Sequence, residues 1–114
     1  MESKKDHKRT IGSVKDEILD FVSKRDWRKY HNPANLSEAI IVEAGELLQL
    51  FLFTDHKKIE KESKVDSVLR ERIEEELADI LIYSIELADH LDMDVSEIIS
   101  KKLKKSSKKH PPII

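Results

Sequence analysis

The chain has 114 residues, of which 39% are apolar and 39% are charged, and its net charge is −2 at neutral pH. This length fits one domain, and with only two glycines and three prolines the composition favours a few long helices over a sandwich or barrel. Because the chain contains no cysteine, disulfides and thiolate metal sites are excluded.

The N-terminal ten residues are charged and lack the apolar segment of a signal peptide, and no apolar run in the chain is long enough to span a membrane. We therefore expect a cytoplasmic protein with no membrane partner. The expected organisation is a flexible N-terminus at residues 1–10, a helical domain at residues 11–110 and a C-terminal tail at residues 111–114.

Apolar residues at helical spacing predict a first amphipathic helix over about residues 10–25. A loop is expected at residues 26–33, where the Asn-Pro pair favours an extended Asn32. The second helix is predicted from about residue 36 to residue 53, with Asn35 as the N-cap of a capping box.

A polar linker with at most one short helical turn is expected at residues 54–66. The third helix is predicted over residues 67–91, and its second half is apolar almost all round. Asp94 is the predicted N-cap of a fourth helix, which the prolines at residues 111 and 112 terminate.

The second and third predicted helices are apolar on nearly every face, which is typical of helices that are buried on all sides. A single chain of this length cannot easily bury two such helices. The predicted fold is therefore all-α, a four-helix bundle that is completed by formation of a homo-oligomer, either a dimer or a tetramer.

Four acids interrupt these apolar helices in two pairs, Glu43 with Glu46 and Glu76 with Asp79. The spacing of three places both carboxylates of a pair on one helix face, and two facing pairs would bring four charges together. Such charges cannot all stay ionised unless something neutralises them, and Mg²⁺, with Mn²⁺ as a substitute, prefers oxygen ligands. The alternative is an ordinary solvent-facing acid, above all for Glu76, which ends a run of three glutamates.

Three other functional classes are alternatives to this metal site. A di-iron bundle needs a Glu-x-x-His pair, and no histidine stands three residues after a glutamate. A non-catalytic helical assembly or regulatory protein would pair its acids with Lys or Arg, yet residues 36–53 and 77–91 contain neither. A nucleic-acid binder would use the six lysines of residues 101–114, but the rest of the chain has 15 basic and 23 acidic residues, which disfavours a stable nucleic-acid partner.

The two acid pairs, Glu43-Ala-Gly-Glu46 and Glu76-Leu-Ala-Asp79, are separated by 29 residues. They resemble the Glu-x-x-Glu, spacer, Glu-x-x-Asp signature of the MazG-like nucleotide pyrophosphohydrolases. Residues 25–36 and 75–83 resemble the substrate pocket and the metal-binding helix of the dCTP pyrophosphatase branch. The resemblance covers about residues 14–111.

The C-terminal Lys102 and Lys109-His110-Pro111 are similar to the family's Lys…Lys-Tyr-Pro ending. Three positions depart from the pattern: His110 stands where Tyr is frequent, Ser106 where Asn is common, and Phe53 where that branch has Trp. These departures bear on base selectivity more than on metal chemistry.

The resemblance implies a MazG-like domain that cleaves a nucleoside triphosphate between its α- and β-phosphates, giving a monophosphate and pyrophosphate in nucleotide-pool house-cleaning. The four acids would hold the metal and be catalytic. Lys102 and Lys109 would bind the phosphates, although a lysine-rich tail is equally compatible with a solvated helix end. Trp27, His31 and Tyr83 are the expected base-binding residues. Core packing is the alternative for Tyr83 and, less strongly, for Trp27, and a loop cap is the alternative for His31.

Overall fold

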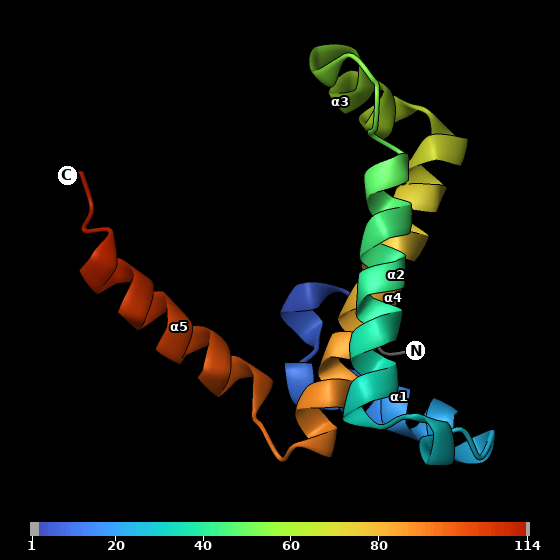
Figure 1. Cartoon of the computed structure of the whole chain (residues 1–114), viewed down its shortest axis with the longest axis vertical. Helices are drawn as coiled ribbons and strands as arrows, with labels where there is room; N and C mark the ends of the chain where they lie inside the picture. The colour runs from blue at the N-terminus through green and yellow to red at the C-terminus, as the bar shows by residue number, and fades with distance from the viewer. Residues whose placement is uncertain (1–2, 114) are drawn as a thin grey trace.

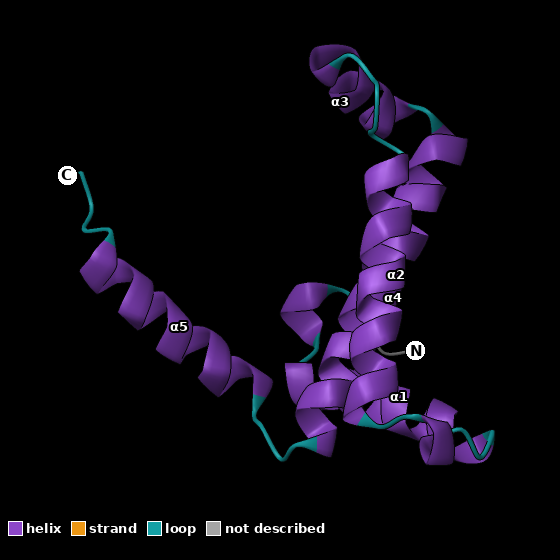
Figure 2. Cartoon of the chain, viewed as in Figure 1, coloured by secondary structure: helices purple, strands orange, loops and turns teal. Residues whose placement is uncertain are grey.

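The computed structural model describes residues 3–113, and these contain five α-helices, two 3₁₀ turns and no strand (Figures 1 and 2). The all-α prediction is confirmed, but the described residues form five α-helices where four were expected. The helices are α1 (Ile11–Lys24), α2 (Pro33–Gln49), α3 (His56–Val65), α4 (Ser67–His90) and α5 (Val95–Lys109), and the turns are η1 (Asp6–Lys8) and η2 (Arg28–Tyr30).

Helices α2 and α4 form the centre of the molecule and run antiparallel along most of their length (Figure 1). Helix α1 packs against α4, and α3 packs against α4 at the opposite end of the pair. Helix α5 extends away from this group as a separate arm (Figure 1). The α2–α4 pair is thus the part of the chain that can hold side chains from distant sequence positions in fixed geometry.

The start of α2 differs from the prediction. The helix begins at Pro33, and Asn32, in an extended conformation as expected, caps it by accepting a hydrogen bond from the Asn35 backbone N–H at 2.9 Å. Asn35 is therefore not the cap; its side-chain amide donates to the Tyr30 carbonyl at 2.8 Å. Pro33 suits the first helical turn because its missing N–H would have had no partner there.

Residues 54–66 were expected to be a linker, and this prediction was wrong because they contain the ten-residue helix α3. Asp55 caps α3 by accepting from the Lys58 N–H, and Asp66 caps α4 by accepting from the Val68 and Leu69 N–H groups. Asp66 also ends α3, since its own N–H donates to the Glu62 carbonyl at 2.7 Å. The two helices therefore meet at a single residue.

The buried core of a single chain is small: among the described residues the buried apolar side chains are Val22, Leu36 and Ala88, and of these Leu36 is fully buried. Large apolar side chains remain exposed on the central helices, including Ile41 at 71%, Leu48 at 58% and Leu81 at 60% exposure. None of the described helices combines the length and the apolar composition that a membrane span requires. In globular proteins, large exposed apolar side chains that gather in one patch mark an interaction site.

Candidate metal centre and adjoining cleft

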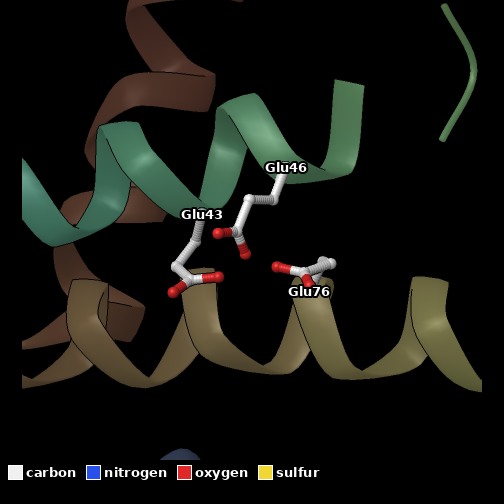
Figure 3. A group of neighbouring side chains, drawn as sticks. All are labelled: Glu43, Glu46 and Glu76. Carbon is white, nitrogen blue, oxygen red and sulfur yellow. The ribbon is translucent and has the colours of Figure 1, made fainter. Parts of the chain in front are cut away.

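Three carboxylates converge between the central helices. Glu43 and Glu46 project from one face of α2, Glu76 projects towards them from α4, and each offers an oxygen within 4.8 Å of the others (Figure 3). The spacing of three residues aligns the first two on one face, and the antiparallel α4 supplies the third. The structure thus brings together three of the four acids expected to form the metal site.

The convergence has an electrostatic consequence at Glu43. The hydrogen bond with Glu76, partial burial and the neighbouring Glu46 raise the pKa of Glu43 from 4.5 to about 7, with a further contribution from the charge of Asp79. One oxygen of Glu76, Oε2, is buried and has no hydrogen-bond partner. Among the described residues, no ion pair joins these carboxylates to Lys or Arg, although a non-catalytic assembly would be expected to contain such pairs.

This donor set fits a hard divalent cation. It consists only of carboxylate oxygens, as Mg²⁺ and Mn²⁺ prefer, and it leaves the buried Glu76 Oε2 available as a ligand. Glu76 is half-buried, whereas Glu74 and Glu75 are exposed, so Glu76 does not lie on the solvated face of α4. The crowded charges are those that a bound cation would neutralise.

Asp79, the fourth expected ligand, lies beside the cluster rather than within its tightest group. It is half-buried and lines a cleft of about 640 Å³ that also contains His31 and Tyr83. Its charge contributes to the raised pKa of both Glu43 and Tyr83. Asp79 therefore lies at the junction between the carboxylate cluster and the cleft.

Aromatic and apolar side chains from α1, the η2 segment and α4 form the wall of this cleft. Trp27 makes an edge-to-face contact with Phe21 at a centroid distance of 5.7 Å, and His31 makes one with Tyr83 at 6.4 Å. Burial, followed by the charges of Asp79, Glu43 and Glu86, raises the pKa of Tyr83. All three expected base-binding residues, Trp27, His31 and Tyr83, thus line one cavity, and its volume lies in the usual range for small-molecule sites.

Sequence reasoning missed Glu86. Its side chain is only 5% exposed, and its Oε1 lies 2.8 Å from His31 Nδ1. The available signal was an acid between Ile85 and Leu87, inside a span already recognised as apolar. The sequence does not reveal its pairing with His31, because that residue is 55 positions away in the chain.

The two lysines expected to bind phosphates are not brought to this site within one chain. Lys102 and Lys109 are exposed residues of α5, which projects away from the α2–α4 pair (Figure 1). Only the beginning of α5 approaches the rest of the fold, where Val95, Ile98 and Ile99 line an apolar groove with residues of α1 and α4.

Sequence comparison finds curated relatives of this chain. Curated relatives include dCTP pyrophosphatase 1 of Bos taurus, 33% identical over 104 residues, and that of Homo sapiens, 31% identical over 104 residues. Each alignment covers 90% of this chain but only 60% and 59% of the respective relative, so the chain spans about three-fifths of their length.

A solved structure is similar over nearly its whole length. It is a pyrophosphatase from Archaeoglobus fulgidus DSM 4304 with a TM-score of 0.78 and 32% sequence identity, and the alignment covers 90% of this chain and 93% of that one. A sequence profile described as the MazG-like family matches residues 39–113, a range that contains all four acids of the two motifs. The chain therefore belongs to the MazG-like family.

Proposed function

We propose that this protein hydrolyses nucleoside triphosphates to monophosphates and pyrophosphate, with a divalent cation bound by Glu43, Glu46, Glu76 and Asp79. The observation that carries the proposal is the convergence of three carboxylates from two helices without a basic partner, beside an aromatic cleft. The pyrophosphatase names of the relatives support the same reaction class.

Mg²⁺ bound at such a site would neutralise phosphate charge and lower the pKa of a water molecule. In this chain, Glu43 and Glu76 would supply the half-buried ligand oxygens. Glu46 is the exposed member of the cluster, and we assign to its carboxylate the orientation and deprotonation of the attacking water. Asp79, which borders both the cluster and the cleft, would link the metal to the bound nucleotide.

The adjoining cleft would hold the base. Trp27 and Tyr83 offer flat apolar surfaces, and stacking of an aromatic side chain on a base contributes roughly 1–3 kcal/mol. His31 adds a polar group to the same wall. A base held here would leave the phosphates directed along α4 towards Asp79 and Glu76, where the charge needs to be stabilised.

The test is a panel of ribo- and deoxyribonucleoside triphosphates incubated with Mg²⁺, with Mn²⁺ or with EDTA, with products separated by chromatography. We expect monophosphate and pyrophosphate in the metal-containing reactions and intact triphosphate in EDTA. Release of orthophosphate and a diphosphate would contradict the assigned bond. If triphosphates bind to the protein but none of those in the panel is hydrolysed, the non-catalytic assembly would be favoured instead.

The exposed apolar surface of the central helices and the groove beside α5 support a homo-oligomer of at least two copies. We propose that a second copy covers this surface. In such an assembly, Lys102 and Lys109 would bind the phosphates at the partner's site, because α5 extends away from the cluster of its own chain. House-cleaning of the nucleotide pool is the role that this activity would serve.

A further inference from the structure

The carboxylate of Glu86 has a buried oxygen with a free hydrogen-bonding position. Its Oε1 accepts from His31 Nδ1 at 2.8 Å, while its Oε2 is buried and has no hydrogen-bond partner. A buried carboxylate oxygen without a donor destabilises the fold, so an unpaired one calls for an explanation. A bound ligand that supplies the missing hydrogen-bond donor would be such an explanation.

The position of Glu86 on α4 indicates which kind of ligand would supply this donor. Glu76, Asp79, Tyr83 and Glu86 follow one another at spacings of three and four, which places them along one face of α4. Glu86 lies about 15 Å along the helix axis from Glu76, at 1.5 Å per residue. The face thus has a carboxylate cluster at one end, Tyr83 in the middle and a buried acceptor at the other end.

A nucleotide has the same order of groups, since its phosphates and its base lie at opposite ends. With the phosphates at the cluster, the base would enter the cleft that Trp27, Tyr83 and Glu86 line together. A carboxylate can only accept hydrogen bonds, so Glu86 favours a base edge that donates. The exocyclic amino group of cytosine donates to a carboxylate, whereas the oxygen at the same position of uracil would be repelled.

We propose that Glu86 is a specificity-determining residue of the base site, with its Oε2 accepting a hydrogen bond from the exocyclic amino group of the bound base. The inference rests on the proposed function for the location of the phosphates. His31 fixes the orientation of the carboxylate by donating from Nδ1 to Oε1, so that Oε2 is the oxygen left for the base. Glu86 thereby selects amino-bearing bases over uracil and thymine.

The experiment compares the affinities of dCMP and dUMP, measured by calorimetry in EDTA, for wild type, Glu86→Gln and Asp89→Asn. Asp89 is a matched control because it lies one turn further along α4, is also acidic and does not line the cleft. In Glu86→Gln the amide oxygen retains the bond from His31 and the NH₂ group faces the base. We expect wild type to prefer dCMP, and the preference to fall at least tenfold or reverse in Glu86→Gln but to persist in Asp89→Asn.

Three outcomes overturn the inference: no preference for dCMP in wild type, equal losses for both nucleotides in Glu86→Gln, or no binding of either nucleotide. Equal losses would assign Glu86 a purely structural role in holding His31. Since the binding measurement involves neither metal nor hydrolysis, the outcome is separable from the proposed function. A changed preference without triphosphate hydrolysis would support the base assignment and reject the activity.

Discussion

Helices α4 and α5 both carry many charged residues, but the two helices use their charge differently. On α4, Glu76 points into a crowded and half-buried cluster in which its Oε2 has no partner. On α5, the lysines are exposed and the helix stands away from the central pair. Unpaired carboxylates in a half-buried cluster indicate a site for a ligand. The solvated lysines of α5 can contribute to such a site only if a second molecule brings one to them.

The largest expected effect comes from removing single charges in the cluster. Glu43→Gln, Glu46→Gln, Glu76→Gln and Asp79→Asn should each lower kcat by about two orders of magnitude or more, because each removes a metal ligand or a charge beside it. Turnover of triphosphate by chromatography and helical content by circular dichroism are the measurements.

Glu75→Gln is the matched control, since Glu75 is exposed and adjoins Glu76. It should retain wild-type turnover. Full activity in any two of the four cluster variants would remove the metal-site assignment and erase the contrast between α4 and α5.

A smaller effect is expected on α5. Lys102→Ala and Lys109→Ala should each weaken triphosphate binding by about one to two decades, since a hydrogen bond to a charged group contributes ~1.5–3 kcal/mol. Nucleoside binding should change little. Lys104→Ala and Lys105→Ala are the controls, and similar small losses in all four variants would mean that the lysines of α5 are merely solvated.

The role given to α5 also requires a second copy. Sedimentation of the wild type at micromolar concentration should show a dimer or larger species, and Leu81→Glu should shift it towards a 13.3 kDa monomer. Leu81 is 60% exposed on α4 and borders the groove beside α5, so a charge there would oppose burial. A stable wild-type monomer would defeat the proposal that the lysines act on a partner's site.

The smallest effect concerns the stability of the metal-free protein. The folded state raises the pKa of Glu43 from 4.5 to about 7, so folding favours its protonated form. This contribution is fully present below pH 4.5 and is lost as pH rises through about 7. In EDTA, the thermal midpoint should therefore be higher at pH 5 than at pH 8, and Glu43→Gln should reduce the difference while Glu75→Gln preserves it.

The sequence was sufficient for the features that depend on local pattern. The periodicity of α1 and α4 predicted both helices to within one or two residues, and the spacing of three placed Glu43 and Glu46 on one face. The unbroken apolar context of Glu43 distinguished it from an ordinary surface acid. These inferences need only the geometry of a single helix.

The features that were missed depend on contacts between distant residues or on weak patterns. Helix α3 has few apolar residues, and Ile59 is the only large apolar side chain in it that is half-buried. Its sequence therefore lacks the apolar stripe that would predict a helix. The partnership of Glu86 with His31 exists only once α4 packs beside the segment that precedes α2. The direction of α5 depends on the turn at residues 91–94, for which periodicity carries no information.

Asp66, the single residue that joins α3 to α4, bears on how the chain can tolerate changes in length. The 29 residues between Glu46 and Glu76 leave α2, form α3 and return along α4, and yet an oxygen of each glutamate lies within 4.8 Å of one on the other. Since loop-closure entropy grows slowly with length, extra residues before α3 would cost little provided that the corner at Asp66 is kept. Insertions before α3 should lengthen the tip of the molecule without moving the carboxylates. An insertion at Asp66 would instead disrupt both the end of α3 and the N-cap of α4.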